Sequence, residues 1–154
     1  GDSFDCIVVP IGRNGPVAPS PFFTRLTGID ADRIAQEGRP LDQGLADFAD
    51  FVGEDAIWSW GKDEITSLAP ACFVAGLVSP LPAARFGNAA ALLLKAGEPL
   101  STIHGLRSHT LLAHFGLPPE PRAHDGLNDA RAVARVLSHL LAAGRLHPND
   151  LRKA

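Results

Sequence analysis

An imidazole and a carboxylate stand five positions apart where the last predicted helix begins, at His124 and Asp129. Asp129 shares a helical stripe with Val133, Val136 and Leu140, so its carboxylate is expected to lean toward the packed side. A carboxylate in that place needs a partner, and a divalent metal ion would serve. His124 could take a proton from water, because an imidazole titrates near neutral pH. Taken alone, the spacing favours the alternative of an ordinary first-turn acid and a surface histidine.

A second acid, Asp63, follows a short buried strand that is predicted over Ala56–Trp60. Gly61 breaks this strand, and Asp63 opens the next predicted helix. Metal ions and ligands collect at such strand ends in α/β sheets, so Asp63 is well placed to hold a divalent ion. The alternative role for Asp63 is a helix N-cap. The neighbouring Lys62 and Glu64 are expected to be solvated charges.

An apolar segment, Leu26–Ile29, follows the aromatic pair Phe22 and Phe23. A nucleoside could rest on such a platform, and the glycine at position 28 would let the backbone approach it closely. The alternative is a turn followed by core residues, which is the commoner role of segments of this kind. By itself the segment is a modest signal.

The elements that must position these residues follow from periodicity and from the turn residues. Phe4–Val9 is a β-branched run closed by Pro10 and predicts a strand. The glycines and prolines that follow predict an extended, rigid connector up to Pro21. The apolar spacing of residues 41–52 then predicts a helix that Gly53 ends.

The second half of the chain is helical in most of its pattern. The run Ala89–Leu94 fits a buried strand or a helical turn equally well, so both stay open. Residues 106–113 predict one further helix. The strongest element is the last helix, which either Asp125 or Asn128 can cap and which Gly144 ends. Its apolar side is expected to contain Ala130, Val133, Ala134, Leu137, Leu140 and Leu141.

Length and composition indicate one compact α/β domain over residues 1–146, followed by a loose tail over residues 147–154. The chain has 154 residues, of which 45% are hydrophobic, and a formal net charge of −3, so a broad basic surface is not indicated.

Cys6 and Cys72 lack metal-ligand spacing, which favours a reducing, cytoplasmic compartment. No apolar run is long enough to span a bilayer, so no membrane partner is expected. Because the chain lacks methionine, Gly1 is not expected to be the encoded start.

In their order, these segments resemble the DEDDh-type 3′–5′ exonucleases. Phe4–Pro10 is similar to the third strand of that family, and Leu26–Ile29 is similar to the segment that follows it. Asp63–Leu68, an acid with a leucine five positions later, resembles the second motif. His124–Ala130 resembles the third motif, and Leu111–Leu117 resembles the helix before it. The resemblance covers nearly the whole chain.

The resemblance implies an RNase H-like mixed sheet flanked by helices. It also implies a metal-dependent 3′–5′ exonuclease that releases nucleotides from the 3′ end of single-stranded RNA or DNA. Two divalent ions, Mg²⁺ or Mn²⁺, would be held by four carboxylates, of which Asp63 and Asp129 match two. His124 matches the general base, while Leu26 and Thr27 match positions that contact the terminal nucleotide.

The chain departs from the family at the first motif, an Asp-x-Glu on the first strand of the domain. No segment before Phe4 supplies this motif, so the sheet is expected to lack its first two strands, and Asp2 and Asp5 lie in the wrong strand. With two of four ligands, the chain is expected to cleave slowly or not at all. A late gene start, a trimmed segment and a degenerate family member stay open as explanations.

The alternative function is a non-catalytic module of the same fold that binds a nucleic-acid end or a protein. An exposed sheet edge left by the missing strands would also predict a homodimer.

Overall fold

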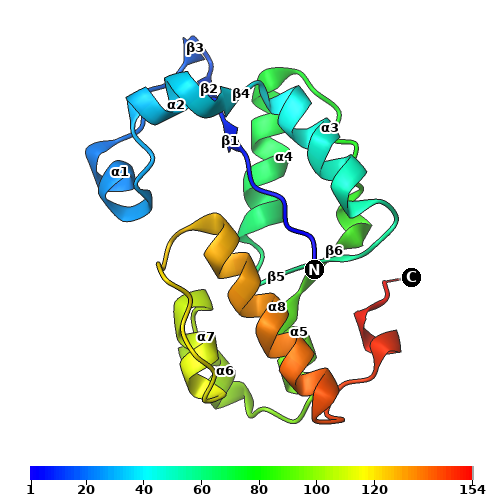
Figure 1. Cartoon of the computed structure of the whole chain (residues 1–154). Helices are drawn as coiled ribbons and strands as arrows, with labels where there is room; N and C mark the ends of the chain where they lie inside the picture. The colour runs from blue at the N-terminus through cyan, green and yellow to red at the C-terminus, as the bar shows by residue number, and fades with distance from the viewer. Residues whose placement is uncertain (154) are drawn as a thin grey trace. The chain divides into compact units, whose positions relative to one another are not determined.

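The computed structural model describes residues 1–153, with the side chain of Asp63 outside the described part. The chain forms two compact units, one of residues 1–53 with 65–82 and the other of residues 54–64 with 83–154. Each unit combines helices with short strands (Figure 1). This mixture agrees with the predicted α/β class.

The first unit is built on a parallel pair of short strands, β1 (Ile7–Val8) and β4 (Gly38–Arg39). The predicted strand over Phe4–Val9 is thus present in shortened form. Helix α3 (Leu41–Val52) packs against β1 (Figure 1). The elements between the two strands are the antiparallel hairpin β2 (Ile11–Gly12) and β3 (Gly15–Pro16), then helix α1 (Pro21–Thr27) and helix α2 (Ala31–Glu37).

The prediction of an extended connector over residues 10–21 was wrong. This segment contains the β2–β3 hairpin and leads directly into α1. Ser20 caps α1 by accepting the backbone N–H of Phe23 at 3.1 Å, and Gly28 ends the helix with a φ of 76°. Pro21 fits the first helical position because the N–H that proline lacks has no partner there in any helix. A proline-rich stretch can therefore introduce a helix.

Helix α3 confirms the helix that was predicted over residues 41–52. Its C-cap is Gly53, whose φ of 55° lies in the left-handed region that favours glycine. Leu45 is buried on its inner side. The rings of Phe48 and Phe51 lie 5.6 and 5.7 Å from the ring of Phe4, which ties the start of the chain to this helix.

The second unit contains a second parallel pair, β5 (Ile57–Ser59) and β6 (Phe86–Asn88). Helix α4 (Asp63–Ala75) begins in this unit. The remaining elements are η1 (Ala83–Arg85), α5 (Ala89–Lys95), α6 (Leu100–Gly105), α7 (Ser108–His114), α8 (Gly126–Ala142) and η2 (Pro148–Leu151). The open choice for Ala89–Leu94 is thus resolved as a helix. The helix predicted over residues 106–113 is present as α7, which begins two residues later at Ser108. Helix α6, which ends just before it, was not predicted.

The core of the second unit lies between α8 and the helices α5 to α7, and Figure 1 shows α8 running beside α7. Its buried residues are Ala89, Leu92, Leu93, Ala96, Ile103, Leu106, Leu111, Leu112, Ala132, Val133, Val136, Leu137, Leu140 and Leu146. Ala130 and Ala134, predicted on the apolar side of α8, are exposed instead. The stripe that begins at Asp129 and includes Val133, Val136 and Leu140 is the face that packs.

The end of the chain, expected as a loose tail, forms η2 and contacts the second unit. The Trp58 indole N–H donates a hydrogen bond to the Leu151 carbonyl at 2.9 Å. Lys95 Nζ lies 2.5 Å from a carboxylate oxygen of Asp150. The side chain of Leu151 packs against the core. These contacts join η2 to β5 and α5.

An ion cluster around Glu98 joins the segment after α5 to the end of α7 and to the turn after α8. The Glu98 carboxylate accepts a hydrogen bond from Arg145 at 2.7 Å and contacts His114 Nε2 at 2.8 Å. Arg145 also donates to the Ala96 carbonyl at 2.9 Å. The bonds from Arg145 and His114 hold the pKa of the Glu98 carboxyl below its ordinary value.

We expect Glu98→Gln to lower the free energy of unfolding by about 1 kcal/mol at neutral pH. Because the folded-state pKa is lowered, the stabilisation is complete above the ordinary glutamate pKa of about 4.3, and it is lost as pH falls through the folded value. Urea unfolding over a pH series measures the difference, and Glu54→Gln, an exposed glutamate of the same unit, is the control. A difference that grows toward acid pH would contradict the prediction.

The two cysteines are free thiols, with Cys72 buried and Cys6 partly buried. Burial raises the pKa of the Cys6 thiol above its ordinary value, which makes it a poorer nucleophile at neutral pH. In the described part of the chain, every helix is too short or too polar to cross a membrane.

Candidate functional site

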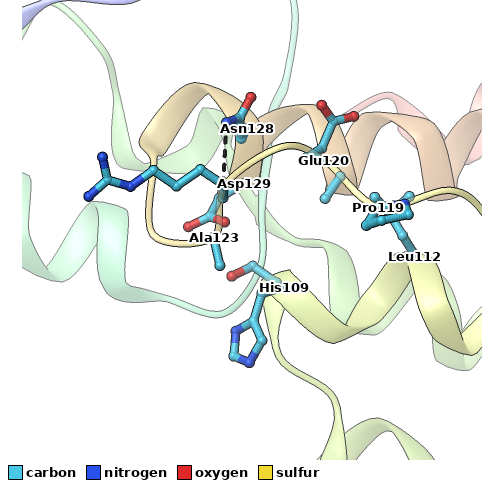
Figure 2. Close-up of a pocket in the computed structure, with 10 residues that line it drawn as sticks. His109, Leu112, Pro119, Glu120, Ala123, Asn128 and Asp129 are labelled. Carbon is cyan, nitrogen blue, oxygen red and sulfur yellow. Dashed lines mark hydrogen bonds between the residues drawn. The ribbon is translucent and has the colours of Figure 1, made fainter. Parts of the chain in front are cut away.

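The start of α8 is organised by Asp125, which resolves the open choice of N-cap. The Asp125 side chain accepts the backbone N–H of Asn128 at 3.1 Å, and its carbonyl accepts the N–H of Asp129 at 2.9 Å. The Asn128 side chain does not cap the helix, because its amide donates a hydrogen bond to the Arg122 carbonyl at 3.3 Å (Figure 2). Asn128 therefore ties the preceding loop to the helix, while Asp125 caps it.

The loop before α8 is held at a second point. Arg135, two turns into α8, donates to a carboxylate oxygen of Glu120 at 2.8 Å. Prolines at positions 118, 119 and 121 restrict the loop further, because each fixes its own φ. The two anchors and the prolines leave His124 at the end of a constrained segment.

His124 adopts a φ of 60°, in the left-handed region that side chains other than glycine rarely occupy. Such a backbone costs on the order of 1 kcal/mol and persists where the surroundings determine it. Residues of this kind cluster at functional sites, where the strain aims a side chain. His124 thus combines a strained backbone with a place beside the carboxylate of Asp129.

The Asp129 carboxylate lies half-buried on the packed side of α8, as the sequence predicted. Burial raises the pKa of the Asp129 carboxyl above its ordinary value, and the negative charge of Asp125 adds to this rise. The ring and the backbone N–H of His124 oppose it, and so does His109. A desolvated carboxylate in this setting favours a cationic partner.

His109 is the residue near this site that the sequence did not single out. It lies on α7, and its ring centroid is 5.3 Å from that of His124, with the planes tilted by 48°. The sequence shows only that a histidine lies in a predicted helix. It does not reveal that this side of the helix faces α8. The structure thus brings His109, His124 and Asp129 together.

A small pocket opens between α7, the loop that follows it and the start of α8, as Figure 2 shows. Its volume is about 280 Å³, with the open mouth included. The residues that line it are Ser108, His109, Leu112, Pro119, Glu120, Arg122, Ala123, Asn128, Asp129 and Ala132. The pocket offers a hydroxyl, an imidazole, a guanidinium, an amide and two carboxylates beside an apolar floor.

The predicted site residue Asp63 belongs to the same unit as Asp129, but its side chain lies outside the described residues. Gly61 has a φ of 97°, and its N–H donates to the Asn88 side chain at 3.1 Å. Helix α8 contacts β5, the strand that leads into this turn. That Asp63 and Asp129 share a metal ion stays a prediction.

The donor chemistry at Asp129 fits a divalent ion of the Mg²⁺ or Mn²⁺ type, because a carboxylate is a hard oxygen ligand. Among the described side chains, no group of three or more His, Cys, Asp or Glu residues is arranged to hold a metal ion. That Asp129 binds a divalent ion stays a prediction.

Leu26 and Thr27, predicted to contact a terminal nucleotide, lie at the end of α1 in the other compact unit. The Thr27 hydroxyl donates to the Phe23 carbonyl at 2.9 Å and accepts the Ile29 N–H at 3.1 Å, so it is occupied within its own helix end. Phe22 is 66% exposed. The Phe22 ring is therefore accessible for stacking, and that a nucleoside binds there stays a prediction.

No family model matches the chain, and no curated protein is significantly similar to it.

Proposed function

We propose that the protein is a metal-dependent 3′–5′ exonuclease of the DEDDh type, with an RNase H-like fold, which shortens single-stranded RNA or DNA from the 3′ end. The observation that carries the proposal is the strained His124 beside the half-buried carboxylate of Asp129. These two residues keep the spacing and order of the third motif that the sequence resembles. Free thiols at both cysteines agree with a reducing, cytoplasmic compartment.

In this proposal, each residue has one role. Asp129 and Asp63 would hold Mg²⁺ or Mn²⁺, which supplies Lewis-acid stabilisation of charge on the phosphate and on the leaving 3′ oxygen. His124 takes the proton of the attacking water, for which its exposed ring is accessible. That Leu26 and Thr27 contact the terminal nucleotide stays a prediction.

A non-catalytic module that binds a nucleic-acid end is the second candidate. The exposed Phe22 and Phe23 on α1 favour it, because bases stack on aromatic side chains without any chemistry. The homodimer through a sheet edge stays a prediction.

The proposal is tested with 5′-labelled RNA and DNA oligonucleotides, incubated with the full-length protein and Mn²⁺. Because only two of the four metal-binding carboxylates of the family are matched, we expect slow formation of a ladder of products shortened from the 3′ end. No ladder should form when the 3′ hydroxyl is blocked by a phosphate. His124→Asn should slow cleavage by about 10²-fold, the usual contribution of a general base. Asparagine is chosen because it tolerates a positive φ and is not a base near neutral pH.

Internal cuts, or an unchanged rate in His124→Asn, would refute the exonuclease proposal. Binding of the labelled strand without any shortening would favour the second candidate.

A further inference from the structure

Two histidine rings meet beside the proposed site, and they come from different elements. His109 is in the first turn of α7, and His124 is in the loop that precedes α8. Their ring centroids are 5.3 Å apart, within the range at which aromatic rings interact favourably. The contact joins two residues that are 15 positions apart in the chain, and it forms because α7 packs on α8.

The two rings stand on different kinds of backbone. Helix α7 is anchored by Leu111 and Leu112, which are both buried in the core of the second unit. His109 projects from this fixed helix, whereas His124 stands on a loop with a strained backbone. Both histidines are exposed, so little core burial depends on their contact. The contact is therefore better suited to orient one ring than to stabilise the fold.

We infer that His109 is a positioning residue whose ring holds the imidazole of His124 in place beside the Asp129 carboxylate. The inference rests on the proposed function, in which His124 is the general base. A base has to lie within hydrogen-bond reach of the water whose proton it takes, and a displacement of about 1 Å can cost on the order of 10²-fold in rate. A loop histidine gains this precision from a rigid neighbour.

A competing role for His109 is direct contact with the substrate, because it also lines the pocket with Ser108 and Arg122. The two roles separate in the kinetics. Loss of a substrate contact that is equally strong in the ground and transition states raises KM, whereas misplacement of the base lowers kcat.

The test compares His109→Ala, which removes the ring, with His109→Phe, which keeps an aromatic ring and removes both nitrogens. We expect His109→Ala to lower kcat about 10-fold with KM unchanged, and His109→Phe to restore most of kcat. His104→Ala, at an exposed histidine of α6 in the same unit, is the matched control and should leave kcat unchanged. A higher KM in both His109 variants would overturn the positioning role in favour of substrate contact.

A second readout does not depend on activity. In the NMR spectrum of the protein, the Cε1–H signal of His124 should shift and broaden in His109→Ala and stay closer to the wild-type position in His109→Phe. An unchanged His124 signal in His109→Ala would overturn the inference. If the wild-type protein does not shorten any oligonucleotide, the exonuclease proposal fails, and the NMR comparison still decides whether His109 orients the ring.

Discussion

Asp129→Asn is expected to reduce cleavage of a labelled oligonucleotide by about 10³-fold, equivalent to about 4 kcal/mol of transition-state stabilisation. Asparagine keeps the size of the side chain and its oxygen but removes the negative charge. A neutral amide holds a divalent ion far less well than a carboxylate does. The effect should appear in kcat with either RNA or DNA as substrate, and Mn²⁺ binding measured by calorimetry should weaken in parallel.

The same substitution should not destabilise the fold. The raised pKa of the Asp129 carboxyl means that the folded protein holds this proton more tightly than the unfolded chain does. The ionised group therefore lowers stability at neutral pH, and the deficit disappears as pH falls below the unfolded-state pKa. We expect the free energy of unfolding of Asp129→Asn at neutral pH to equal or exceed that of the wild type. A site that costs stability while it supports activity is typical of functional residues.

Asp42→Asn is the matched control for this prediction, because it also removes a carboxylate from the first turn of a helix, in α3. This residue is exposed, and its replacement should leave cleavage unchanged. Equal losses in the two variants would show a general charge effect. Full activity in Asp129→Asn would remove Asp129 from the site.

Leu93→Ala is expected to lower the free energy of unfolding by about 3 kcal/mol. Leu93 is 1% exposed and lies in the core between α5 and the helices around it. Truncation to alanine removes apolar burial and leaves a cavity, and the close-packed surroundings can fill it only in part. Urea or thermal unfolding followed by circular dichroism measures the change.

Leu94→Ala makes the same chemical change one residue later in the same helix, at a side chain that is 51% exposed. The intrinsic helix propensity changes equally in both variants, so the difference between them reports burial alone. We expect Leu94→Ala to cost less than about 1 kcal/mol. Similar losses in the two variants would mean that α5 does not pack through Leu93.

The parts of the fold that could be predicted are those whose signals are local. Helix α3 has a repeated apolar spacing and a glycine end, and both were readable because they lie within one segment. The placement of Asp129 on the packed side of α8 followed in the same way from its stripe with Val133, Val136 and Leu140. Helix α1 could also have been predicted, because Ser20 and Pro21 form a regular helix start. The many prolines in this segment favoured a loop instead.

Other features depend on contacts between segments far apart in the chain. The run Ala89–Leu94 is too short for its period to distinguish strand from helix. The burial of Ala89, Leu92, Leu93 and Ala96, at helical spacing, becomes visible only when other segments pack against them. The meeting of His109 with His124 had no local signal. It arises because α7 packs on α8, which brings together residues whose spacing along the chain has no period. Periodicity reveals which face of a helix is buried, whereas packing in three dimensions selects the partner that this face meets.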